Sequence, residues 1–197
     1  PYWIGQRERA EPPAGLEPLP SFTWEAPARG TEPAHTPLYE LQRQAGAQMV
    51  RYHGWETPAM YSTVPEEQRA VRTAAGLFDL GYMGLFELSG KDVHLFLDSL
   101  TTNDVSRLCV GDSQYSFLLN PDGSVLDDIW LYRVAPSQYW MVTNAGNRER
   151  VAAWLEAVRA GEVRVDERRP WSRALAAETA IIADLTSASA IREARSH

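Results

Sequence analysis

Two polar side chains stand between apolar runs in the middle of this sequence. Asp104 follows Thr101-Thr102-Asn103, directly after an apolar run that ends at Leu100, and Asn120 opens the sequence Asn120-Pro121-Asp122-Gly123. A loop after a helix end is a usual place for a functional carboxylate, and no lysine stands beside Asp104 to neutralise it. The pattern predicts a pocket that offers a carboxylate and an amide to a ligand.

Each of these residues also has a purely structural interpretation. Asn-Asp is an ordinary turn and capping pair, and Asn120 could serve only to start the Pro-Asp-Gly turn. In a site, the Asn120 amide would bind a heterocycle through a donor and an acceptor together. Tyr115, Tyr82 and Met83 could form the walls around a flat aromatic ligand, although strand residues of these types more often belong to the core.

Asp127 and Asp128 are the other carboxylates that could act together. Adjacent residues on a strand point to opposite faces, so these two cannot act as a pair on one substrate. We expect one of them to hold the hairpin turn or a neighbouring cation.

Several enzyme classes lack their motifs here. The sequence has no glycine-rich phosphate loop and no Gly-x-Ser-x-Gly, and its four histidines are scattered without metal-ligand spacing. We therefore expect no metal.

Composition points to a globular protein of the cytoplasm. The 197 residues are 44% hydrophobic, and the net charge of -7 argues against nucleic acid and anionic membranes as partners. The single cysteine, Cys109, cannot form an internal disulfide, which fits a reducing compartment. No apolar run reaches the length of a membrane span and no secretory signal is visible, so we expect a soluble, cytoplasmic protein.

The elements that would position these residues alternate between helices and strands. Helices are predicted near residues 37–45, 64–76, 91–100 and 147–158, and a turn at 54–58. Strands are predicted at residues 49–52, 76–80, 85–90, 114–119, 125–134 and 139–143, with a further one starting at 163–165. The strands at 114–119 and 125–134 should pair as a hairpin. The expected class is α+β, with mixed, mainly antiparallel sheets and packed helices.

A proline-rich arm precedes these elements. Residues 1–35 hold most of the prolines together with apolar side chains such as Phe22 and Trp24, so we expect an extended clasp on the domain surface. A mobile tail is the alternative. The segment Tyr2-Trp3-Ile4-Gly5-Gln6 has no role that the sequence explains.

An ordered series of short motifs resembles the amino-terminal portion of aminomethyltransferase, the T-protein of the glycine cleavage system. The series runs from residue 36 to about residue 155. Its members are Thr36-Pro37-Leu38-Tyr39, Gly54-Trp55-Glu56, Arg69-Ala70-Val71-Arg72, Gly76-Leu77-Phe78-Asp79, Met83-Gly84, Thr102-Asn103-Asp104-Val105, Gln114-Tyr115-Ser116, Asn120-Pro121-Asp122-Gly123, Asp127-Asp128 and Asn144-Ala145-Gly146-Asn147-Arg148-Glu149.

The resemblance implies a fold, a substrate and a reaction. It implies a ring of α+β domains around tetrahydrofolate, which accepts a methylene unit from the aminomethyl-lipoyl arm of the H-protein as ammonia leaves. The aspartate of the Thr-Asn-Asp-Val motif, here Asp104, would lie beside the folate ring nitrogens as the catalytic residue. A carboxylate there can orient a weakly basic amine and stabilise positive charge without acting as a nucleophile. By the same resemblance Asn120, Tyr115, Met83 and Asn103 would contact the folate.

The sequence departs from the family after Val165. The later Gly-Tyr-Thr-Gly-Glu and Arg-Leu-Glu type motifs and the usual C-terminal barrel are not visible. We therefore divide the chain into an arm (1–35), an aminomethyltransferase-like folate-binding domain (36–165) and a divergent Ala-rich tail or truncated second domain (166–197). The chain resembles an amino-terminal piece, a degraded paralogue or a half completed by another subunit.

Three functions remain open at this point. The first is a tetrahydrofolate-dependent aminomethyltransferase, and the second is a non-catalytic folate-binding or assembly module. The third is a related demethylase that acts on a sulfonium or aryl ether compound. Apolar surface left open by a shortened ring also favours self-association.

Overall fold

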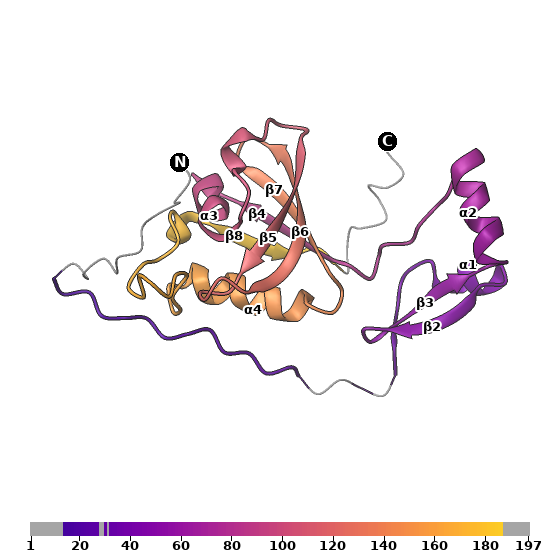
Figure 1. Ribbon diagram of the computed structural model, residues 1–197, viewed down its shortest axis with the longest axis horizontal. Helices are drawn as coiled ribbons and strands as arrows, with labels where there is room; N and C mark the ends of the chain where they lie inside the picture. The colour runs from indigo at the N-terminus through magenta and orange to yellow at the C-terminus, as the bar shows by residue number, and fades with distance from the viewer. Residues whose placement is uncertain (1–13, 28–29, 31, 187–197) are drawn as a thin grey trace.

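Two β-sheets organise the chain, and the computed structural model describes residues 14–27, 30 and 32–186. The smaller sheet has the strand order β1-β3-β2, and the larger has the order β5-β6-β7-β4-β8 (Figure 1). Most strand pairs are antiparallel, and helices accompany both sheets. The expected α+β class with mainly antiparallel sheets is confirmed.

The smaller sheet and two helices form the unit drawn in purple at the right of Figure 1. Its elements are β1 (Ala34–His35), α1 (Tyr39–Gln44), β2 (Gln48–Tyr52), β3 (Trp55–Met60) and α2 (Val64–Thr73). β1 runs parallel to β3, and β2 runs antiparallel to it.

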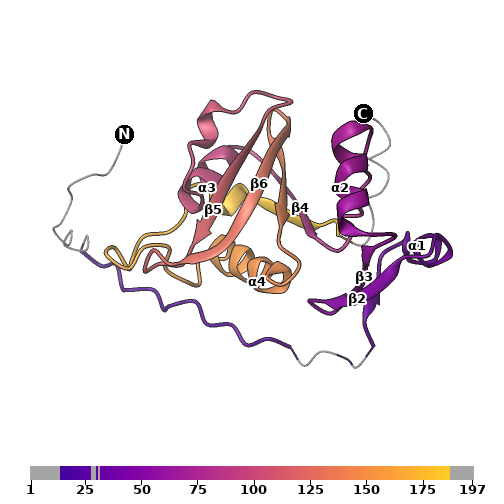
Figure 2. The same cartoon turned by 45° about the vertical axis from the view of Figure 1, so that its right-hand side comes forward.

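The turn expected at residues 54–58 is wrong in extent. His53 and Gly54 alone make the turn, both with positive φ (48° and 85°), and Tyr52 pairs with Trp55. Positive φ at both central residues is the geometry of the tight hairpin turn that matches strand twist. The strand β3 therefore takes up the residues that the sequence suggested for the turn. The hairpin tip points toward the start of the fourth helix (Figure 2), where the His53 ring lies against Gly146.

The strand expected at residues 76–80 is also wrong. This segment connects the two sheets, and Leu77 and Phe78 are 90% and 69% exposed. Asp79 fixes its course, because one carboxylate oxygen accepts hydrogen bonds from Thr36 Oγ1 and Gln42 Nε2, each at 2.6 Å. The apolar run is thus held by a carboxylate rather than by strand pairing.

The larger sheet carries the central hairpin of the chain. Its strands are β4 (Gly84–Ser89), β5 (Ser113–Leu119), β6 (Val125–Ala135), β7 (Gln138–Thr143) and β8 (Ile181–Asp184). Each pairing within it is antiparallel, and β5 and β6 form the predicted hairpin.

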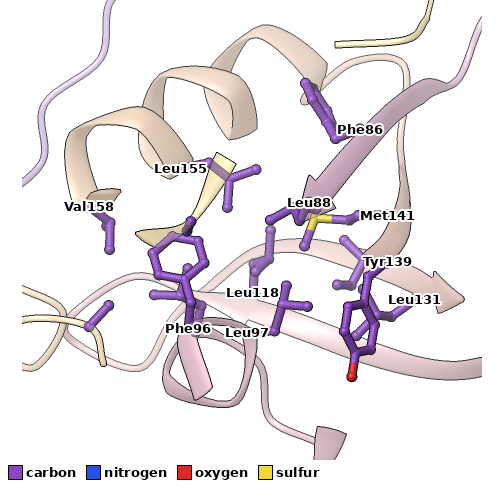
Figure 3. Close-up of a cluster of buried hydrophobic side chains, with 14 of the residues drawn as sticks. Phe86, Leu88, Phe96, Leu97, Leu118, Leu131, Tyr139, Met141, Leu155 and Val158 are labelled. Atoms are coloured by element: carbon purple, nitrogen blue, oxygen red, sulfur yellow. The ribbon is translucent and has the colours of Figure 1, made fainter. Parts of the chain in front are cut away.

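Two helices cover one face of this sheet. They are α3 (Val93–Leu100) and α4 (Arg148–Arg159), and both follow their predicted positions closely. Their apolar residues meet every second residue of the strands in one buried cluster. Figure 3 shows ten of these side chains with labels: Phe86, Leu88, Phe96, Leu97, Leu118, Leu131, Tyr139, Met141, Leu155 and Val158. In the described part of the chain, no helix is long and apolar enough to cross a membrane.

The residues after α4 pack onto the same core. No strand forms at residues 163–165, so that expectation is wrong, although Val163 is buried. The chain instead returns through Ala177, which is buried, and adds β8 beside β4. Residues 187–197 lie outside the described part.

The described part of the arm runs along this returning segment. Leu19 N donates to Pro170 O at 2.8 Å, and Arg164 N donates to Pro20 O at 3.0 Å. The Phe22 ring packs edge-on against Trp154, with centroids 5.2 Å apart. The segment from Tyr2 to Gln6 lies outside the described residues.

The core predicts a contrast between two leucines of α3. Leu97 is fully buried and Leu95 is 38% exposed. We expect Leu97→Ala to lower the free energy of unfolding by about 3 kcal/mol, because it leaves a cavity. Leu95→Ala is the matched control and should cost about 1 kcal/mol or less. Urea unfolding followed by circular dichroism measures both, and equal losses would contradict this packing.

Candidate functional site

The loop that ends in Asp104 is fixed along β5, an edge strand of the larger sheet. Thr102 N donates to Phe117 O at 3.1 Å, and Phe117 N donates to Thr102 Oγ1 at 3.2 Å. Asn103 N donates to Ser116 Oγ at 3.0 Å. Backbone groups on a strand edge need partners, and this loop supplies them. The loop is therefore held in place before it reaches the candidate carboxylate.

The side chain of Asn103 brings Asp104 and Tyr115 together. Asn103 Nδ2 donates to Tyr115 O at 3.1 Å, and Asp104 N donates to Asn103 Oδ1 at 3.0 Å. Three of the five residues predicted for the site are thus neighbours. In this structure the amide of Asn103 links the loop to the strand.

Asp104 presents an exposed carboxylate with one oxygen occupied. Oδ1 accepts hydrogen bonds from Ser106 N at 3.0 Å and Ser106 Oγ at 2.6 Å, at the start of the short helix η1 (Val105–Arg107). Among the described residues, no hydrogen bond reaches Oδ2. The Ser106 hydroxyl chiefly lowers the pKa of Asp104, and its backbone amide and the charge of Arg107 lower it further. The carboxylate is consequently ionised at neutral pH, with Oδ2 open to a ligand.

Tyr115 lies on the outer face of the sheet rather than in the core. Its side chain is 42% exposed, and its hydroxyl donates to Asp128 Oδ2 at 2.9 Å. That hydrogen bond is the main cause of its raised pKa. The ring meets Phe117 and Trp130 edge-on, with centroids 5.3 and 5.7 Å apart. An aromatic surface therefore adjoins the Asp104 loop.

Asn120 starts the hairpin turn between β5 and β6. Its Nδ2 donates to Ser124 Oγ at 2.9 Å, and its Oδ1 accepts from Arg150 Nη2 at 3.3 Å. The turn role that the sequence offered as an alternative is present. Asn120 also lines a cavity of ≈ 180 Å³, together with Leu100 and Trp154.

Met83 lies at the other side of the sheet. It directly precedes β4, and its backbone N donates to Leu80 O at 3.0 Å. The strands β6 and β7 separate β4 from β5, so the two strands are three spacings, or about 14 Å, apart. Tyr82, the other aromatic wall considered, packs edge-on against Tyr52 at 5.9 Å in the smaller sheet. The structure does not bring Met83 or Tyr82 beside Asp104.

The paired aspartates make a network that sequence reasoning missed. Asp127 is 2% exposed and Asp128 is exposed, so they point to opposite faces as expected. The expectation that one of them holds the turn or a cation is wrong, because Asp127 accepts amide hydrogen bonds from Asn144 (3.0 Å) and Asn147 (2.7 Å). Asp122 holds the turn instead, through Ser124. The only feature of the sequence that could have indicated this network is the pair of asparagines in Asn144-Ala145-Gly146-Asn147.

The described residues contain no group of three or more His, Cys, Asp or Glu side chains arranged to hold a metal ion. What the site offers is an exposed, ionised carboxylate on a loop whose Asn103 amide donates to the backbone oxygen of Tyr115. The molecule is therefore an α+β domain whose candidate site is built around the exposed carboxylate of Asp104.

Comparison with known proteins places this domain in a family. The family model described as "GCVT N-terminal domain" matches residues 38–177, and the chain belongs to that family. Aminomethyltransferase of Symbiobacterium thermophilum is 47% identical over 124 residues, which are 63% of this chain and 33% of that protein. Aminomethyltransferase of Bacillus subtilis is 40% identical over 157 residues, which are 78% of this chain and 43% of that protein.

A solved structure supports the same relationship. The crystal structure of glycine cleavage system aminomethyltransferase T from Bartonella henselae has 32% sequence identity and a TM-score of 0.65. The match covers 78% of this chain and 38% of that one. The chain thus spans between 33% and 43% of the length of these three proteins. It is related to aminomethyltransferases through their amino-terminal part.

The geometry around Asp104 predicts an effect of Ser106 on its titration. Because the Ser106 hydroxyl lowers the pKa of Asp104, Ser106→Ala should raise it toward its usual value of 3.8. A lowered pKa means that ionised Asp104 favours the folded state above pH 3.8, and that this contribution is lost as the pH falls through the lowered pKa. Carboxyl ¹³C NMR titration measures the shift.

Ser124→Ala is the matched control, because Ser124 donates in the same way to Asp122. It should raise the pKa of Asp122 and leave that of Asp104 unchanged. An unchanged Asp104 titration in Ser106→Ala would show that the hydrogen bond does not form in solution.

Proposed function

We propose that this chain is the amino-terminal, folate-binding part of a tetrahydrofolate-dependent aminomethyltransferase of glycine cleavage. The observation that carries the proposal is Asp104, an exposed, ionised carboxylate with an open oxygen on a loop fixed to β5. Membership of the family and the names of its relatives support the same reaction.

The proposed chemistry gives Asp104 the central role. Tetrahydrofolate, the substrate, supplies the amine nitrogens that accept a one-carbon unit from the aminomethyl-lipoyl arm of an H-protein, with ammonia released. Asp104 Oδ2 would orient such an amine and stabilise the positive charge that develops there. The open oxygen of Asp104 and the exposed ring of Tyr115 fit a flat ligand with N–H donors.

The other predicted contacts would touch different parts of an extended ligand. The side-chain amide of Asn103 bonds to the backbone N of Asp104 and to the backbone O of Tyr115. Asn120 is at the hairpin turn, five residues along the chain from Tyr115, and Met83 is three strand spacings away from it. A ligand that met both Tyr115 and Asn120 would have to reach past the end of the hairpin, because Asn120 faces Arg150 of α4 on the helix-covered side of the sheet.

The partners follow from the proposed reaction. They are tetrahydrofolate and a lipoylated H-protein in the cytoplasm, with no nucleic acid and no membrane. The exposed side chains of Leu77 and Phe78 offer apolar surface for self-association.

The domain organisation that we propose has an arm (1–35), a folate-binding domain (36–165) and a divergent tail (166–197). Strand β8 of the tail pairs with β4 in the sheet of the domain.

A second candidate is a non-catalytic folate-binding or assembly module. The observation that favours it is that Asn120 bonds within its own turn and Met83 precedes a different strand, so two of the predicted folate contacts are not gathered around Asp104. A related tetrahydrofolate-dependent demethylase would use the same folate site with a different donor pocket.

Replacement of Asp104 tests the catalytic proposal. The full chain should bind tetrahydrofolate in a fluorescence titration and, with lipoylated H-protein, form methylenetetrahydrofolate. Asp104→Ala should lower kcat by about 100-fold or more, because the charge-stabilising carboxylate is lost. Turnover retained in Asp104→Ala would refute the catalytic role.

Asp112→Ala is the control for loss of an exposed carboxylate. Asp112 accepts a hydrogen bond from Cys109 N at 2.9 Å and lies outside the proposed site, so its kcat should stay within about twofold. Folate binding without turnover in the unaltered chain would instead favour the module.

A further inference from the structure

The hydroxyl of Tyr115 has already donated its hydrogen. Asp128 Oδ2 accepts it at 2.9 Å, and a phenol has only one O–H to give. The remaining lone pairs of the Tyr115 oxygen can therefore only accept hydrogen bonds from a molecule on the outer face of the sheet.

Asp128 is itself fixed by the network behind it. Asn144 Nδ2 donates to Asp128 Oδ1 at 2.8 Å and to Asp127 Oδ1 at 3.0 Å. Asp127 is buried, and it also accepts from Asn144 N at 3.0 Å and from Asn147 Nδ2 at 2.7 Å. A buried carboxylate with several N–H donors is a strongly held anchor, so Asn144 connects the exposed Asp128 to the rigid core.

The ring of Tyr115 is held from its sides as well. Phe117 lies at an interplanar angle of 78° and Trp130 at 62°, both in edge-on contact. Neither ring supplies a hydrogen-bonding group to the Tyr115 oxygen. The direction of the hydroxyl is thus set by Asp128.

We propose that Asp128 is a positioning residue that makes Tyr115 an acceptor and thereby selects ligands with an N–H donor at this point of the site. The inference rests on the proposed function, and it names the feature of a reduced pterin that the site would recognise. The reduced ring carries N–H groups where the oxidised ring has bare nitrogens. Asp128 would in this way favour reduced over oxidised folate.

The raised pKa of Tyr115 agrees with this arrangement. The hydrogen bond to Asp128 is its largest cause, and the charges of Asp128 and Asp127 add to it. The phenol consequently keeps its proton at neutral pH and continues to donate to Asp128.

A pair of ligands tests the selection directly. Affinities of the full chain for tetrahydrofolate and for folic acid, measured by fluorescence titration without oxygen, give a preference ratio. Tyr115→Phe should lower that ratio by about tenfold, as expected for one hydrogen bond. Asp128→Asn should lower it by a similar factor, since an amide can donate to the phenol and reverse its direction. The variant that carries both substitutions should lower the preference ratio no more than either substitution alone.

Tyr132→Phe is the matched control. Tyr132 is 39% exposed on the same outer face, and among the described residues its hydroxyl has no hydrogen bond. Its loss should leave the ratio unchanged. A second measurement, ultraviolet titration of tyrosine, should show a lower pKa for Tyr115 in Asp128→Asn than in the unaltered chain.

The outcomes separate the two proposals. If Asp128→Asn and Tyr115→Phe weaken both ligands equally, or the Tyr115 titration does not move, Asp128 is not a positioning residue. Loss of turnover in Asp104→Ala would then still support the proposed function. If the unaltered chain binds neither ligand, both proposals are wrong.

Discussion

The free edge of β5 is the constraint on which the rest of the site depends. This strand pairs with β6 on one side only, and its other edge would leave backbone groups without partners. Thr102 and Asn103 satisfy that edge with backbone and side-chain hydrogen bonds. Because Asn103 bonds to the backbone oxygen of Tyr115 and to Asp104 N, the loop that carries Asp104 is fixed on this edge. A carboxylate on an unattached loop would have no fixed distance from the aromatic rings.

The two faces of the sheet are connected at the end of β7. Strand alternation directs Asp127 inward and Asp128 outward, which makes them poor candidates for joint action. Asn144 stands where the chain leaves the sheet, and its amide reaches both carboxylates. The polar chain from Tyr115 through Asp128 and Asn144 thus ends at the start of α4. The exposed side chains of Asp128 and Tyr115 are in this way held by hydrogen bonds that lead back to the buried Asp127.

Much of the larger sheet could be predicted, and the misses have physical causes. The hairpin of β5 and β6 follows from alternating residues around Pro121-Asp122-Gly123, whose turn chemistry is local. The strand at 76–80 was wrong because apolar type alone does not show whether a partner strand is available, and Asp79 is bound by residues about forty positions earlier. Strand β8 was missed because its short sequence becomes a strand only beside β4.

The sequence by itself determined the turn at Asn120, the helices of the core and the choice of Asp104 as the carboxylate of interest. These depend on periodicity and on hydrogen bonds between near neighbours, such as Asp104 with Ser106 and Asn120 with Ser124. Only the tertiary structure decided that Tyr115 donates to Asp128 and that Asn144 joins two carboxylates. Those partners are 13 and 16 or more residues apart, and the register between strands, which no local pattern encodes, sets their distance.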